Sequence, residues 1–148
     1  MPQVDAAVRE DESIALRDVS RSFLEGQRRH VVLERASASI AGGEIVAITG
    51  RSGSGKSTLL NLIGGLDDPD SGEVIVAGRP VHALGEPART LFRRRHIGFV
   101  YQFFNLVPTL DVEENVRLVL ELNGVRGAQA RRRSAVLLAE VGLGERLT

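Results

Sequence analysis

The 148-residue chain has no cysteine and no tryptophan, and only one of its 19 basic residues is a lysine. The lack of cysteine excludes disulfides, thiol chemistry and zinc–thiolate sites. No apolar run approaches the ~18 residues that a membrane helix requires, and the acidic first dozen residues are unlike a signal peptide. The formal net charge is zero, which gives no support for a nucleic-acid-binding protein. We therefore expect a soluble globular protein that reaches a membrane only through a partner.

The one lysine, Lys56, lies in a glycine-rich stretch with the pattern G-x-x-x-x-G-K-S. Glycines let the backbone curl so that its N–H groups point at phosphate oxygens, and a helix N-terminus adds further donors. Lys56 can reach the outer phosphates, and the Ser57 hydroxyl is placed for Mg²⁺. A glycine-rich turn without a ligand is the alternative. The predicted phosphate-binding loop comprises Gly50, Arg51, Ser52, Gly53, Ser54, Gly55, Lys56, Ser57 and Thr58.

The flanks of this loop fit a strand–loop–helix unit, with an apolar, β-branched run at 44–49 and an amphipathic helical pattern at 56–63. Other segments have strand patterns, namely 13–20, 31–33, 36–40, 73–77 and 96–101. Further helices are predicted at 88–95, after a capping box formed by Asp111 and Glu114, and at about 128–141. The basic helix 88–95 presents either a solvated charged face or a phosphate or lipid site.

Three segments in this order, GRSGSGKST, SGEVIVAGRPV and RRRHIGFVYQFFNLVPTLDVEENV, resemble the ATP-binding cassette of ABC transporters. The resemblance is to the lipoprotein-releasing and macrolide-export type, and it covers residues 13–148. It implies an α/β fold of the P-loop NTPase class, present in part. We expect a flexible N-terminus at 1–12 and an antiparallel β subdomain with an incomplete core sheet and the P-loop helix at 13–102. The start of the helical subdomain follows at 103–148.

The resemblance also implies roles for residues outside the loop. Phe23 is placed like the aromatic residue that stacks on adenine, although a phenylalanine of the core is the alternative. Gln102 is placed like the glutamine that joins the Mg²⁺ shell or orients the attacking water, the alternative being an exposed loop amide. Phe103, Phe104 and Leu106 either form a groove for a transmembrane subunit or pack the helical subdomain. ATP and Mg²⁺ are the implied cofactors, with Lys56 and Gln102 as catalytic residues.

The family's signature motif, acidic Walker B strand and switch histidine have no counterpart among the 148 residues. We therefore expect a truncated cassette with an exposed apolar sheet edge, which binds ATP but hydrolyses it poorly on its own. The implied partners are a transmembrane permease and a second nucleotide-binding domain, identical or different, at the cytoplasmic face of the plasma membrane. The alternatives are a soluble ABC ATPase without a transport role and a nucleotide-binding fragment without turnover. A P-loop kinase or GTPase has the weakest support.

Overall fold

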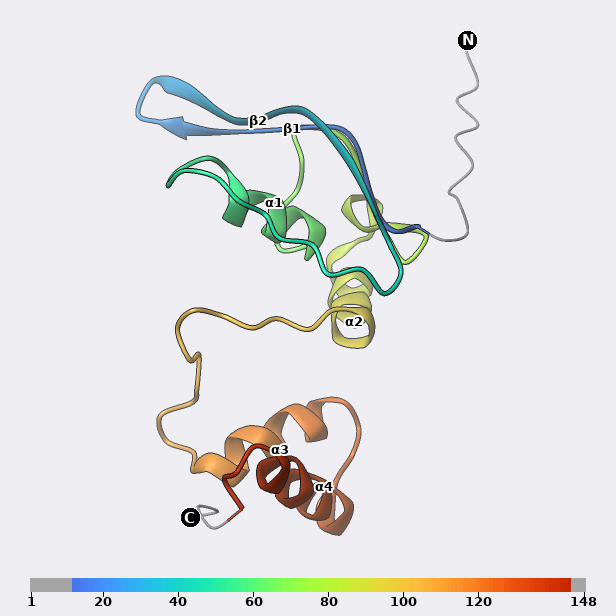
Figure 1. The fold of residues 1–148 in the computed structure, drawn as a ribbon, viewed down its shortest axis with the longest axis vertical. Helices are drawn as coiled ribbons and strands as arrows, with labels where there is room; N and C mark the ends of the chain where they lie inside the picture. The colour runs from blue at the N-terminus through green and yellow to red at the C-terminus, as the bar shows by residue number, and fades with distance from the viewer. Residues whose placement is uncertain (1–11, 145–148) are drawn as a thin grey trace. The chain divides into compact units, whose positions relative to one another are not determined.

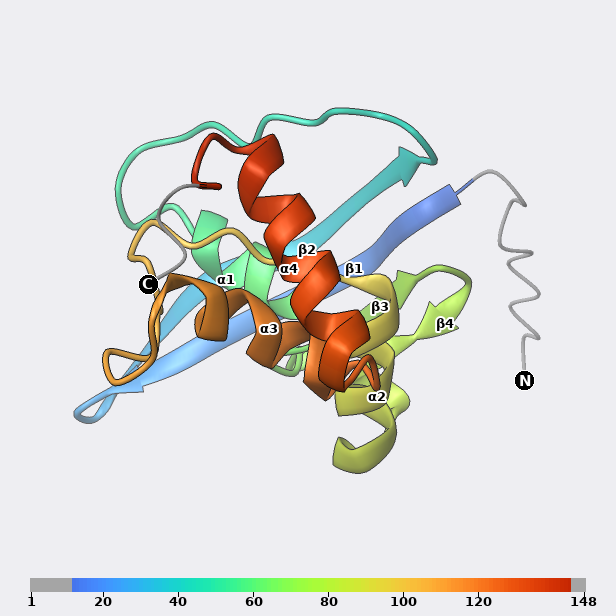
Figure 2. The same ribbon diagram turned by 90° about the horizontal axis from the view of Figure 1, so that it is seen from below.

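A long antiparallel hairpin is the most extended feature of the N-terminal part of the chain (Figure 1). Its strands are β1, Glu12–Glu25, and β2, Arg28–Ala41. Strand β1 also pairs antiparallel with β3, Ser71–Val76, and β3 pairs with β4, Arg79–Pro80. The sheet order is therefore β2-β1-β3-β4 (Figure 2).

The structure is a computed structural model that describes residues 12–144 and divides after Gly98 into two compact units. The predicted flexible segment 1–12 lies outside the described residues, apart from Glu12, with which β1 begins. The strand predicted at 13–20 is confirmed and is longer than its pattern indicated. The two short strands predicted at 31–33 and 36–40 form one strand, which continues through an irregularity at Arg35, whose φ is 47°.

Helices cover the sheet of the first unit and close its core. Helix α1, Lys56–Ile63, confirms the helix predicted after the phosphate-binding loop. The 3₁₀ turn η1, Val81–Ala83, and helix α2, Glu86–His96, follow the β3–β4 hairpin. One apolar cluster joins these elements, and its buried members are Leu16, Val19, Leu62, Val74, Val76, Val81 and Phe92. The sheet and helix α1 thus share one core.

Two predicted strands are not present. They were predicted at 44–49 and 96–101. His96 is the last residue of α2, residues 44–49 and 97–101 run without regular secondary structure, and Ile45 and Val100 are fully exposed. A parallel core strand takes its hydrogen bonds from neighbouring strands, and no segment of residues 12–144 pairs with either run. The strand assignments were therefore wrong for the described residues. The sheet of the described residues is the antiparallel one, which agrees with the expected antiparallel β subdomain.

The second unit consists of two helices, α3, Val112–Leu122, and α4, Gly127–Glu140. Helix α3 begins with the predicted capping box, in which the Asp111 carboxylate accepts from the Glu114 N–H and the Glu114 carboxylate accepts from the Asp111 N–H. Ala130, Ser134 and Leu138 are the buried residues of α4 and recur every four residues. Both predicted helices are therefore confirmed. None of the helices between residues 12 and 144 has the length and apolarity of a membrane span.

Candidate functional site

The glycine-rich stretch forms a loop that ends in the first turn of α1. Gly55 is the N-cap of this helix and has a φ of 85°, which L residues rarely adopt. A Cβ at this position would lie 2.8 Å from Val32 Cγ1, so the loop can pack this closely on β2 only with glycine. Because Gly55 has no side chain, no side chain caps the first N–H groups of α1. These groups remain available as donors for an anion.

The Lys56 ammonium is held by the loop itself. Its Nζ donates to the carbonyl oxygens of Gly50 and Arg51 at 2.9 and 2.7 Å, and it lies 3.4 Å from Ser54 Oγ. The positive charge therefore sits within the curve of the loop, where a phosphate would meet both the ammonium and the backbone N–H groups.

The loop and the β1–β2 hairpin line one pocket of about 330 Å³. The loop side is formed by Gly53 to Thr58, and the hairpin side by Phe23, Glu25, His30 and Val32. Phe23 is 39% exposed as a residue, so it is not enclosed by the core. The pocket thus combines an aromatic face with a cationic, N–H-rich loop. These are the two surfaces that a base and a phosphate chain require.

Three residues of this pocket, Glu25, His30 and Val32, were not identified from the sequence. The signal that could have found them is strand geometry. Phe23 lies opposite His30 in the β1–β2 register, and residues two apart on a strand share a face. Once Phe23 is a candidate, its neighbours on the same face of the hairpin become candidates as well.

Not every predicted site residue lies in this pocket. Gly50, Arg51 and Ser52 belong to the loop but are outside the pocket lining. Gln102 is exposed in a bend of the second unit, so its approach to the loop stays a prediction. Phe103, Phe104 and Leu106 are also exposed, and Leu106 lines an apolar groove of about 810 Å³ with residues of α3 and α4.

A magnesium ion would find one protein ligand on the loop. Ser57 is exposed in the first turn of α1, and its hydroxyl is the kind of hard oxygen ligand that Mg²⁺ prefers. Among residues 12–144 no three histidine or acidic side chains cluster as a metal site. Mg²⁺ takes few protein ligands when substrate phosphates supply the others, so the residues present fit this mode of binding.

Comparison with known proteins places these features in a family. The ABC transporter family model matches residues 16–148. The lipoprotein-releasing system ATP-binding protein LolD of Pseudomonas syringae pv. tomato is 48% identical over 134 residues, which cover 90% of this chain and 59% of that protein. The uncharacterized ABC transporter ATP-binding protein YbbA of Escherichia coli K12 is 42% identical with the same coverage. The chain therefore spans about three-fifths of the length of these curated relatives.

Two solved structures agree with the sequence relatives. The dimeric structure of MJ0796, a bacterial ABC transporter cassette, is 40% identical with a TM-score of 0.79 and covers 86% of this chain and 56% of that chain. A post-hydrolysis state of MJ0796 bound to ADP and Pi has a TM-score of 0.76 at 40% identity, covering 86% of this chain and 57% of that one. The fold, the loop and the order of the motifs agree with these matches, and the chain belongs to the ABC transporter family.

Proposed function

We propose that the chain is the nucleotide-binding part of an ABC transporter's ATP-binding subunit and that the pocket on its first unit takes ATP with Mg²⁺. The observation that carries this proposal is the pairing of Phe23 with the loop residues Gly53 to Thr58 around a single pocket of about 330 Å³. A structural turn would need neither an aromatic face nor a lysine held inside its curve.

Each group of the site has a distinct task in this proposal. The N–H groups at the start of α1 and the Lys56 ammonium bind the phosphate chain, and the Phe23 ring stacks on adenine. Ser57 would hold Mg²⁺, which would neutralise charge on the phosphates. To Gln102 we assign the role of a further oxygen ligand of the metal or of the group that orients water, as the resemblance to the family implies.

Binding rather than turnover is the activity we assign to this chain alone. The two side chains of the described lining that are ordinary general bases, Glu25 and His30, belong to the hairpin that carries Phe23. The loop side of the lining offers only glycine, serine, threonine and a protonated lysine, so it places no general base next to the phosphates. The chain is therefore expected to bind ATP and to hydrolyse it poorly.

We further propose a transmembrane permease and a second nucleotide-binding domain as partners, at the cytoplasmic face of the plasma membrane. The names of two relatives support this part. LolD is described as part of a lipoprotein-releasing system, and MJ0796 as a dimeric cassette. Co-purification of the chain with a membrane permease would support a transport role, whereas failure to recover any permease with the chain would favour a non-transport ABC ATPase.

The nucleotide site is tested by titrating the chain with a fluorescent ATP analogue, with Mg²⁺ and with a chelator. Lys56→Ala should weaken binding by about tenfold or more, because the ammonium makes charge-assisted contacts to the phosphates. Arg35→Gln is the matched control, since the ion pair of Arg35 with Asp18, at 3.3 Å, is exposed. Equal affinity of the wild type and Lys56→Ala would contradict the proposed site. Steady-state phosphate release that depends on Lys56 would contradict the assignment of poor hydrolysis.

A further inference from the structure

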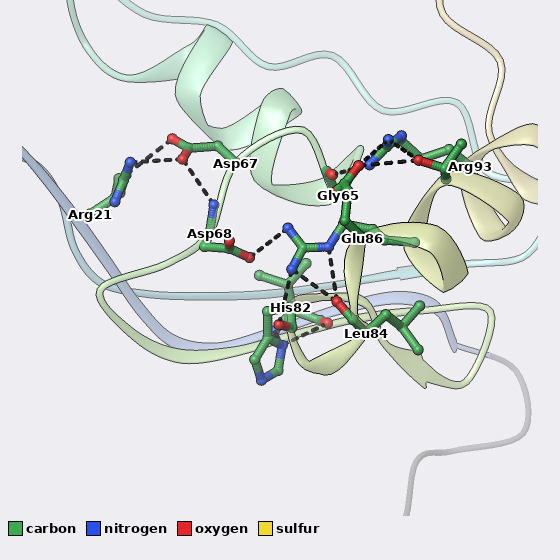
Figure 3. Close-up of polar contacts among 11 residues, drawn as sticks. Arg21, Gly65, Asp67, Asp68, His82, Leu84, Glu86 and Arg93 are labelled. Carbon is green, nitrogen blue, oxygen red and sulfur yellow. Dashed lines mark hydrogen bonds and ion pairs between the residues drawn. The ribbon is translucent and has the colours of Figure 1, made fainter.

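Arg21 joins the candidate base-stacking residue to the turn behind the phosphate-binding helix. It lies two residues before Phe23 on β1, and its guanidinium carbon is 4.8 Å from the centre of the Phe23 ring. The same guanidinium donates two hydrogen bonds to the Asp67 carboxylate, from Nε to Oδ2 at 3.0 Å and from Nη2 to Oδ1 at 2.7 Å (Figure 3). Its remaining Nη1 donates to Asp70 Oδ1 at 3.0 Å.

This arrangement leaves the guanidinium little freedom to move. Both partners in the two-bond contact are largely covered, with the Arg21 side chain 22% exposed and that of Asp67 25%. A planar guanidinium held by a carboxylate in this way has a fixed orientation as well as a fixed position. Its contact with Phe23 then constrains the ring, although Arg21 itself lies outside the pocket lining.

The two aspartates that hold Arg21 belong to the segment that follows the helix of the phosphate-binding loop. Asp67 and Asp70 lie in the turn that follows α1, and α1 begins at Lys56. The Asp70 N–H also donates to the Ser20 carbonyl on β1, at 2.8 Å. Arg21 thus sets where the Phe23 ring lies relative to the helix that carries the loop.

The charges of the cluster balance. Arg21 and Arg29 supply two positive charges, and Asp67 and Asp70 supply two negative charges within ion-pair distance. A cluster without net charge gives little general attraction for a triphosphate. Its effect on a nucleotide must therefore act through the position of Phe23.

We propose that Arg21 is a positioning residue, which holds the Phe23 ring so that it can stack on the nucleobase. This inference rests on the proposed function. It predicts that the loss of Arg21 weakens the part of nucleotide affinity that depends on the base and leaves the part that depends on the phosphates.

The test compares the affinities of the full chain for ATP and for inorganic tripolyphosphate, both by competition against a fluorescent ATP analogue. The ratio of the two affinities measures the contribution of the nucleoside. We expect Phe23→Ala to abolish most of the preference for ATP over tripolyphosphate. Arg21→Gln should lower the ratio by about threefold to tenfold, as cation–π and ion-pair contacts of this kind allow. The tripolyphosphate affinity should change by less than about twofold at 0.3 M salt, where exposed charges are screened.

Two further variants separate positioning from a general loss of structure. Asp67→Asn keeps Arg21 but removes the charge that anchors it, and should lower the same ratio. In the Phe23→Ala background, Arg21→Gln should have no additional effect on the ratio, because the ring through which it acts is gone. Arg35→Gln should leave both affinities unchanged, since its ion pair with Asp18 is exposed.

The possible outcomes distinguish this inference from the proposed function. If the wild-type chain binds neither ATP nor tripolyphosphate, the proposed nucleotide site itself is contradicted. If ATP binds and Arg21→Gln leaves the ratio intact, only the role of Arg21 is contradicted. A proportional loss of both affinities would show that Arg21 supports the fold without positioning the ring. If Arg21→Gln does not fold, an unchanged ratio in Asp67→Asn would overturn the inference, and a lowered ratio would support it.

Discussion

Gly55 is the residue at which the phosphate-binding loop touches β2. Its φ is 85°, and a Cβ would meet Val32 Cγ1 at 2.8 Å and the Val32 carbonyl oxygen at 3.0 Å. Gly53, in the same loop, has a φ of 78°, but a Cβ there would point into open space. The two glycines therefore share a backbone requirement and differ in the room that surrounds them.

This pair of glycines allows strain to be separated from steric contact. We expect Gly53→Ala to lower the free energy of unfolding by about 1 kcal/mol, through the left-handed backbone alone. Gly55→Ala should lower it by about 2 kcal/mol or more, because Val32 must also move. Urea denaturation followed by circular dichroism measures both values. Equal losses in the two variants would show that the contact with Val32 does not constrain the loop.

Asp70, in the turn after α1, holds the β1–β2 hairpin through contacts whose strength depends on pH. The Ser22 hydroxyl and the Arg29 guanidinium, with a smaller contribution from Arg21, lower the pKa of Asp70 to about 2. A depressed pKa means that the ionised carboxylate stabilises the folded state, and this contribution is complete above the unfolded pKa of about 3.9. It is lost as the pH falls from about 4 towards 2.

The comparison of the wild type with Asp70→Asn tests this attachment. The difference between their free energies of unfolding should be constant above about pH 5 and should shrink between about pH 4 and pH 2. Ser22→Ala removes the strongest hydrogen bond to the carboxylate, so in this background the contribution of Asp70 should be lost at a higher pH. Urea midpoints measured from pH 2 to 7 provide the data. A difference that stays constant over this whole range would contradict the proposed linkage.

At the scale of elements, a buried polar contact joins α3 to α4. Ser134 is fully buried, and its Oγ lies 2.5 Å from Glu113 Oε1 and 2.9 Å from the Arg131 carbonyl oxygen. Glu113 also accepts from Arg117 Nη1, at 2.7 Å, so its charge is compensated. The hydroxyl therefore completes a contact that would otherwise leave a carboxylate oxygen short of a donor.

Ser134→Ala should weaken the α3–α4 pair by about 1 to 2 kcal/mol, the usual cost of an unsatisfied buried acceptor. Hydrogen exchange resolved by segment measures this loss, which should appear in α3 and α4 and leave β1 and β3 unchanged. Gln129→Ala is the control, because Gln129 is an exposed residue of the same helix. Unaltered exchange in α3 would show that the hydroxyl contributes nothing to helix packing.

The elements that the sequence predicted correctly are those with local signals. Helix α3 has its capping box and α1 has its loop, and both begin where these signals indicate. The runs 44–49 and 96–101 have apolar patterns typical of strands, yet pairing depends on strands elsewhere in the chain, and none of the described strands pairs with them. Local pattern therefore predicts the preference for extended backbone and does not predict the sheet.

The same distinction applies to the candidate site. The glycine-rich loop could be picked out because its residue types, their spacing and the flanking patterns are all local in the sequence. The link between Arg21 and Asp67 could not, because the two residues are 46 positions apart and each is an ordinary charged residue in its own segment. Only the packing of β1 beside the turn after α1 brings them together.

At the scale of the whole molecule, large apolar surfaces remain in contact with solvent in both units. In the first unit Ile45, Val46 and Ile48 are exposed in the run before the phosphate-binding loop. In the second unit Val100 is fully exposed, and the groove along α3 and α4 is lined mainly by apolar side chains. Unpaired β-branched runs are templates for pairing with other chains. We therefore expect the solution behaviour of the chain to depend on these segments.

Two isosteric substitutions test whether the exposed runs cause self-association. Val100→Thr changes a fully exposed side chain and should leave the free energy of unfolding within about 0.5 kcal/mol of the wild type. It should also slow aggregation, measured by light scattering at increasing concentration, because the run becomes less apolar. Val74→Thr places the same hydroxyl in the core, where Val74 is fully buried, and should cost about 2 kcal/mol and accelerate aggregation. If Val100→Thr aggregates as fast as the wild type while remaining equally stable, the run around Val100 is not where the chains associate.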